Sequence, residues 1–260
     1  MIKINHKNMK HIINWKAFLV LLGLAMISIA CVFPYVISVQ GELLNKIGQP
    51  IYVIFLAQFI QSLILFSVVI FLGLLLAKKL NFKLPLLEAI LEKGDYKAVL
   101  KSILGKSIFL GIVVAVAIYV LDILFAMKGT IITTHENYAP IWQKLLAAVY
   151  GGVAEEILMR LFLMLFFVWI SAKLFKKVEP SKTSIVMSIF LAAVIFGLGH
   201  LPITASITSI TPIVIGRAII LNGIGGIVFG WLFWKKGLES AIIAHFTTDI
   251  FLLTLLPLFF

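Results

Sequence analysis

Long apolar stretches, separated by short segments that carry lysines, alternate along the whole chain. A transmembrane helix needs roughly 20 predominantly apolar residues to cross the hydrocarbon core of a bilayer. Stretches of suitable length occur at residues 17–38, 51–77, 107–126, 140–172, 183–201, 212–234 and 239–257. The pattern therefore predicts an all-α protein, a polytopic transmembrane bundle of about seven helices. Splitting residues 203–234 into two helices would give eight.

Residues 80–106 follow a different pattern. After Pro85, apolar and charged residues recur at helical spacing instead of forming an uninterrupted apolar run. Such a pattern is typical of an amphipathic helix that lies on the membrane surface, and equally of a solvated helix in a loop. The next span is expected to begin only at residue 107.

The composition excludes a soluble protein. Of the 260 residues, 62% are hydrophobic and 13% are charged, so a soluble domain of this size could not make its surface polar. The single cysteine excludes an intramolecular disulfide. We expect one integrated membrane domain, with N-terminal spans and an amphipathic inner loop in residues 1–139 and the functional core in residues 140–257.

The distribution of lysines predicts the orientation in the membrane. The formal net charge is +11, and most of the basic residues fall in alternate loops, for example at Lys78, Lys79, Lys235 and Lys236. The positive-inside rule places these loops in the cytoplasm, together with the N-terminal Lys3, Lys7 and Lys10 of a multi-pass plasma-membrane protein. Because the basic residues flank spans and form no stripe, we expect contacts with anionic lipids and no nucleic-acid partner.

The segment GGVAEEILMR carries two acids and an arginine inside the apolar stretch 140–172. An ionisable residue at membrane depth costs roughly 2.5–3.5 kcal/mol on insertion scales, so it indicates a function or a tight ion pair. On an α-helix Glu156 and Arg160 are i,i+4 neighbours in the favourable orientation for pairing. Glu155 points about 100° away from Glu156. One glutamate can therefore be neutralised while Glu155 faces a polar cavity.

Two histidines add polar groups on other spans. His200 ends the span 183–201, and His245 and Asp249 are i,i+4 neighbours on the last span. Two imidazoles and carboxylates can coordinate zinc, and they can equally activate water by acid–base chemistry. With the predicted boundaries, Glu155 lies near mid-membrane, His200 near the outer end and His245 nearer the inner end. They can meet only if helices are tilted or if the span boundaries lie several residues away from those predicted.

Three short motifs in this order carry a resemblance to a known family. EEILMR matches E-E-x-x-x-R, FGLGH (Phe196 to His200) matches F-x-x-x-H, and HFTTD (His245 to Asp249) matches H-x-x-x-N/D. Together they resemble the CAAX protease and bacteriocin-processing family of intramembrane endopeptidases, which includes the type II CAAX prenyl proteases. The likeness covers roughly residues 140–250.

The resemblance implies roles for the site residues. Glu155 and His200 would activate the attacking water, and His245 and Asp249 would stabilise the oxyanion. Glu156, Arg160 and Phe196 would support the structure of the site. The family often has Asn where this chain has Asp249, which cannot donate a hydrogen bond when ionised. We therefore expect Asp249 to be protonated, to orient His245, or to bind one Zn²⁺ together with His200, His245 and Glu155.

The expected function is hydrolysis of peptide bonds in membrane-associated, lipidated or secreted peptides. A catalytically idle scaffold or immunity protein would retain the same motifs for packing. A proton-coupled transporter also places Glu, His and Asp inside spans. The sequence assigns no role in catalysis to Asp122, Arg217 or Asn222. Asp122 is expected to snorkel to the membrane surface or to pair with a residue of another helix, and the other two are expected at structural or cavity-facing positions.

Overall fold

The computed structural model of the chain describes residues 13–127, 139–177 and 179–255. All regular elements in these ranges are helices, and seven are long and apolar enough to cross a membrane. The predicted helical bundle and its seven spans are confirmed. The helices are α1 (Trp15–Lys46), α2 (Ile51–Leu80), α3 (Pro85–Leu91), α4 (Tyr96–Ala126), α6 (Ile141–Tyr150), η2 (Gly151–Glu155), η3 (Ile157–Met164), α7 (Leu165–Leu174), α8 (Lys182–Gly199), α9 (Leu201–Ala205), α10 (Pro212–Lys236), α11 (Leu238–Ile250) and η4 (Phe251–Leu255).

The third span is longer than predicted, and its expected start at residue 107 is wrong. Only the short α3 stands apart, and α4 already begins at Tyr96. The Asp95 carboxylate accepts a hydrogen bond from the backbone N–H of Ala98 at 2.9 Å, which caps the helix. The α3 helix is held to the bundle by Glu239 of α11, whose Oε1 accepts from the N–H of Leu87 at 2.8 Å.

The span with the two glutamates is one long helix, Ile141–Leu174, whose central part is π-helical. The π-helical segments η2 and η3 lie on either side of Glu156. A π-helix pairs each N–H with the carbonyl five residues earlier; it is rare and is frequently found at functional sites. The expected angle of about 100° between the Glu155 and Glu156 side chains holds for an α-helix. It does not apply to this π-helical segment.

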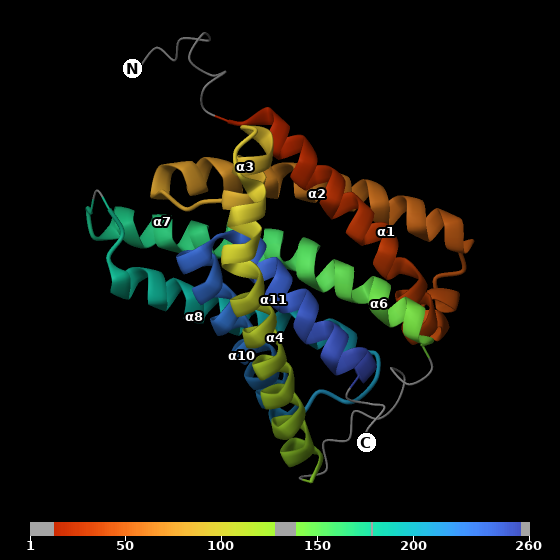
Figure 1. Cartoon of the computed structure of the whole chain (residues 1–260). Coiled ribbons are helices and arrows are strands. Elements are labelled where there is room, and N and C mark those ends of the chain that lie inside the picture. Colours follow the sequence, from red (N-terminus) through yellow and green to blue (C-terminus); the bar gives the residue numbers. More distant parts are fainter. Residues whose placement is uncertain (1–12, 128–138, 178, 256–260) are drawn as a thin grey trace.

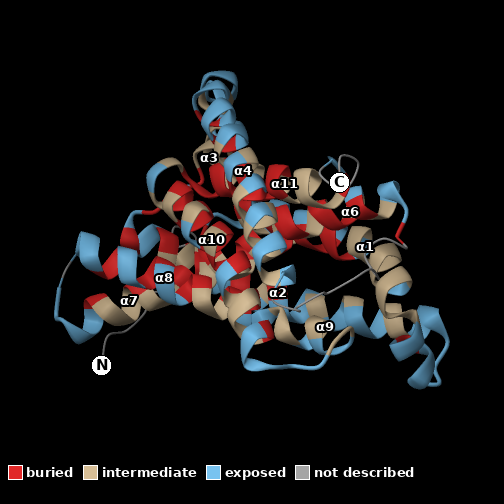
Figure 2. Ribbon diagram, turned by 90° about the horizontal axis from the view of Figure 1, so that it is seen from below, coloured by how far each residue is buried: buried red, intermediate tan, exposed pale blue. Residues whose placement is uncertain are grey.

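Helix α11 lies in the middle of the bundle, with α4 running across it (Figure 1). Helices α8 and α10 pack closely through small residues, because a Cβ at Gly226 would lie 2.7 Å from the Cβ of Ala193. Gly230 allows the same close approach, because its Cβ would lie 2.9 Å from Cγ2 of Ile189 on α8. Buried residues concentrate around α11 and the helices packed against it, α6 and α10, and exposed residues cover the outward-facing sides (Figure 2).

Asp122 and Arg217, two polar residues outside the predicted site, pair with each other. Nε of Arg217 on α10 donates to Oδ1 of Asp122 on α4 at 2.6 Å. The pair is partly exposed, with 18% and 41% of the two side chains accessible, and it joins two spans.

Lys3, Lys7 and Lys10, like most of the loop 127–139, lie outside the described residues.

Candidate active site

A cavity of about 500 Å³ opens between α1 and α2 on one side and η2, α8, α9, α10 and α11 on the other. The four residues predicted to carry chemistry all line it: Glu155, His200, His245 and Asp249. These residues come from three spans that the sequence placed at different depths. The fold therefore brings the predicted set together.

Glu156 and Arg160 form the predicted ion pair. Nε of Arg160 lies 3.2 Å from Oε2 of Glu156, and the two side chains are 1% and 0% exposed. The guanidinium lies over the rings of Phe196 and Phe229, with its carbon 5.3 and 5.8 Å from the ring centres. Such cation–π contacts stabilise a desolvated cation. Arg160 thus lies behind the cavity wall, in contact with aromatic rings from α8 and α10.

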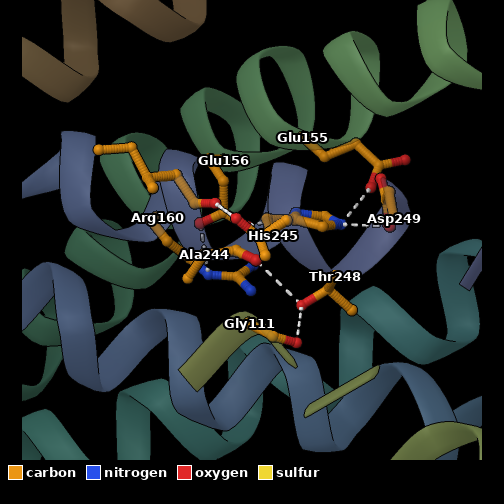
Figure 3. A network of polar contacts seen from close by, with 10 residues as sticks. Gly111, Glu155, Glu156, Arg160, Ala244, His245, Thr248 and Asp249 are labelled. Atoms are coloured by element: carbon orange, nitrogen blue, oxygen red, sulfur yellow. Dashed lines mark hydrogen bonds and ion pairs between the residues drawn. The ribbon is translucent and has the colours of Figure 1, made fainter. Parts of the chain in front are cut away.

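Glu156 also contacts His245. Its Oε1 lies 2.8 Å from Nδ1 of His245, while its other oxygen faces Arg160 (Figure 3). An ionised carboxylate only accepts hydrogen bonds, so Nδ1 of the imidazole is the donor. The neutral ring then has its lone pair on Nε2. Glu156 therefore fixes both the orientation of His245 and which nitrogen is presented to the cavity.

The two remaining carboxylates approach the opposite side of the same imidazole. Oε2 of Glu155 lies 3.8 Å from Nε2 of His245, and Oδ1 of Asp249 lies 3.6 Å from it (Figure 3). The Glu155 side chain is 19% exposed, whereas that of Glu156 is fully buried. The expected division between a paired glutamate and a cavity-facing glutamate agrees with this geometry.

His200 is oriented by a contact with the last turn of α8, the helix that it follows. Its Nδ1 lies 2.8 Å from the carbonyl oxygen of Phe196, one turn earlier. A carbonyl oxygen can only accept, so Nδ1 carries the hydrogen and Nε2 has the lone pair. The Phe196 ring meets the rings of His200 and His245 edge-on, at 4.8 and 5.8 Å between centres. Phe196 therefore contacts both histidines as well as Arg160.

Helix α11 is fixed against α4 directly beside the site. The Thr248 hydroxyl lies 2.9 Å from the carbonyl oxygens of Gly111 and of Ala244 (Figure 3). A Cβ at Gly111 would lie 2.5 Å from the Ala244 oxygen, so only glycine allows this approach. The close packing sets the position of His245, which is one residue from Ala244 in the sequence.

Sequence reasoning missed several residues that shape the site. A Cβ at Gly151 would collide with Oδ2 of Asp249 and lie 3.3 Å from Nε2 of His245. The Phe229 ring stacks on the His245 ring, 4.7 Å between centres and 22° from parallel. In the sequence, a glycine close to the acidic motif is only a weak indication of the contact between Gly151 and Asp249. No local sequence pattern indicates that Phe229 stacks on His245, because Phe229 is one of many phenylalanines in apolar spans.

The wall opposite the histidines comes from the first two spans. It is mostly apolar, with three polar side chains, Tyr35 of α1 and Gln58 and Ser62 of α2. Asn222 of α10 also lines the cavity, and its Nδ2 donates to the Ala218 carbonyl at 2.9 Å. The cavity is thus built from residues on both sides of the chain's midpoint.

The side chains that line the cavity include four potential zinc ligands, Glu155, His200, His245 and Asp249. Structural and catalytic zinc sites use at least three protein ligands at roughly 2.0–2.3 Å around one point. In the described part of the chain, no group of three or more His, Cys, Asp and Glu side chains is arranged to hold a metal ion. The residues as placed do not fit zinc. Zinc binding stays a sequence-based prediction, and no catalytic step below passes through a metal.

A family model matches part of the chain. Residues 137–251 match the family described as type II CAAX prenyl endopeptidase Rce1-like. This segment contains all three motifs and every residue of the polar cluster, so the resemblance that the motifs suggested is confirmed for residues 137–251. No curated protein and no solved structure matches the chain. Residues 1–136, which supply the opposite wall of the cavity, lie outside the match.

Proposed function

We propose that this integral membrane protein, whose residues 137–251 carry an Rce1-like type II CAAX prenyl endopeptidase segment, is a glutamate-dependent intramembrane endopeptidase. The family implies protease activity in general. The single observation that carries the finer proposal is the cavity in which Glu155, His200, His245 and Asp249 converge. A carboxylate and two imidazoles that line one cavity are a suitable set for activating water.

In the proposed first step, the Glu155 carboxylate takes a proton from a water molecule in the cavity. His200 orients that water through its Nε2 lone pair. The water oxygen bonds to the scissile carbonyl carbon, and the π electrons of the C=O bond move to its oxygen. The result is a tetrahedral oxyanion, whose charge must be met by hydrogen-bond donors placed in advance.

In the second step the intermediate collapses. The C=O bond re-forms, the C–N bond breaks, and the leaving amine receives the proton held by Glu155. The sum is one water added across one peptide bond. In its protonated form, held by Glu156, His245 presents Nε2–H to the oxyanion. Glu156 and Arg160 take part only by positioning this ring.

The substrate class follows from the walls of the cavity. The α1 and α2 wall contains Ile29, Val32, Val36 and Leu65, which suit an apolar or lipid-modified segment, and a few polar side chains, which suit a peptide backbone. The site lies within membrane-spanning helices. We therefore propose peptides at or in the membrane as substrates, among them lipidated or secreted ones.

The orientation with a cytoplasmic N-terminus is part of the proposal. Lysine–tryptophan contacts lie at one predicted side of the membrane, between Lys79 and Trp169, Lys173 and Trp169, Lys106 and Trp231, and Lys235 and Trp234. Tryptophans gather at membrane interfaces, and lysines there attract anionic lipids. The Lys-rich side is the cytoplasmic one by the positive-inside rule.

A direct test uses purified protein in vesicles with two matched peptides, one carrying a C-terminal prenyl-cysteine motif and the other the same sequence without the lipid. Mass spectrometry of the products reports the bond that is cut. In parallel, the peptides in membranes of cells that express the wild type are compared with those of cells expressing Glu155→Ala. The proposal requires at least one peptide that the wild type shortens and the variant leaves intact.

A further inference from the structure

We infer that Asn222 of α10 is a catalytic residue that donates a hydrogen bond to the oxyanion. This inference rests on the proposed peptidase function. It concerns a residue outside the three motifs, on a helix to which the motifs assign no chemistry. It also explains how the site works with Asp249 in place of an amide.

The need for another donor follows from the charges in the cavity. Glu155 serves as the base, and Asp249 only accepts hydrogen bonds when ionised. Of the four predicted residues, only the histidines can then offer an N–H group, and the ring of His200 has its Nδ1–H occupied by Phe196. Asn222 lines the same cavity and carries a side-chain amide with two N–H groups.

The packing of α8 against α10 places Asn222 beside His200. A Cβ at Gly197 would lie 2.8 Å from the Ala218 carbonyl oxygen. The same oxygen accepts the hydrogen bond from Nδ2 of Asn222 at 2.9 Å. The Asn222 amide is therefore held at the level of Gly197, less than one helical turn before His200.

The position of Phe229 relates Asn222 to His245 as well. The Phe229 ring points along α10 towards the N-terminus of that helix. Its Cε2 lies 3.0 Å from the position that a Cβ of Gly225 would occupy. His245 stacks on this ring. Gly225 is three residues after Asn222, which is roughly 4.5 Å along a helix axis. Measured along the helix axes, Asn222 therefore lies about one helical turn from both His200 and His245. It is on the same wall of the cavity as these two histidines.

The amide is held in place and still has a hydrogen to donate. One N–H of Nδ2 is directed to the Ala218 carbonyl, which leaves the second N–H of the same nitrogen for a ligand in the cavity. Gln58 is another amide in the cavity, but it lies on α2, in the opposite wall. Asn222 is the amide on the same wall as the histidines.

The test measures kcat and KM of wild type, Asn222→Ala and the similarly shaped Asn222→Leu on one peptide that the wild type cleaves. Removing one oxyanion donor lowers kcat by roughly 10²–10³-fold, and we expect this loss with little change in KM. The matched control is Ser188→Ala of α8, whose hydroxyl also bonds a carbonyl four residues earlier but lies outside the cavity. It should keep the wild-type kcat.

A rescue experiment separates a donor from a structural residue. Asp249→Asn introduces an amide that can reach the same oxyanion, so Asn222→Ala should cost at least about tenfold less in that background than in the wild type. Equal losses in both backgrounds, or a kcat within about threefold of wild type in both Asn222 variants, would overturn the inference. If Glu155→Gln is inactive in the same preparation, such a result leaves the peptidase function standing.

Discussion

Oε1 of Glu156 lies 2.8 Å from Nδ1 of His245, across 89 residues of sequence. This contact joins the buried ion pair to the residue that faces the cavity, because the other oxygen of the same carboxylate meets Arg160. Glu155, the next residue back along the chain, approaches the opposite nitrogen of the same ring. Two adjacent glutamates thus flank one imidazole: Glu156 holds it from the protein interior, and Glu155 approaches it from the cavity.

Arg160→Ala should strongly reduce the stability of the protein. Removing one partner of a buried pair costs roughly 3–5 kcal/mol, since the charge of Glu156 is then stranded. Thermal unfolding in detergent and the yield of folded protein measure the effect. Arg217→Ala is the comparison, because its pair with Asp122 is partly exposed and should cost less. Equal melting temperatures for Arg160→Ala and wild type would show that the pair does not stabilise the fold.

Gly151→Ala should impair catalysis more than folding. The added methyl group would collide with the Asp249 carboxylate and press on Nε2 of His245, so both side chains must move. Catalytic groups displaced by about 1 Å commonly lose roughly 10²-fold in rate. Gly216→Ala on α10 is the control, because no atom lies within 4 Å of its added Cβ. A fully active Gly151→Ala enzyme would mean that the Asp249 position is not required.

Asp249→Asn separates a zinc enzyme from one that works without metal. Because the described donor atoms form no three-ligand group, we expect purified wild type to hold well below one zinc per chain. The variant should then show a raised kcat, as the new amide adds a donor for the oxyanion. Metal analysis and kinetics on the same samples decide the matter. One equivalent of zinc in the wild type, lost together with activity in the variant, would instead establish the metal site.

The sequence predicted those features that depend on local spacing. The i,i+4 rule found the Glu156–Arg160 pair and placed His245 and Asp249 on one helix face, and their atoms do lie 3.2 and 3.6 Å apart. Hydropathy found the seven spans. It missed the start of α4, although Asp95 before a helical pattern was a usable capping signal.

Features that depend on how helices rotate against one another could not be predicted. The contact between Glu156 and His245 and the stacking of Phe229 on that ring join spans far apart in sequence. The level of Asn222 follows from the close approach of Gly197 to α10, which a single apolar sequence does not reveal. The π-helical turns around the glutamates also lack a sequence signal, since propensities are defined for α-helices.

The central claim is that Glu155 is the base, and one substitution tests it. Glu155→Gln keeps the size of the side chain and removes its ability to take a proton. Cleavage of a peptide that the wild type cuts is measured in vesicles, with thermal stability recorded alongside and Glu42→Gln, an exposed site, as control. We predict no detectable product from Glu155→Gln, a wild-type melting temperature, and full activity in the control. Cleavage by Glu155→Gln at the wild-type rate would contradict the account.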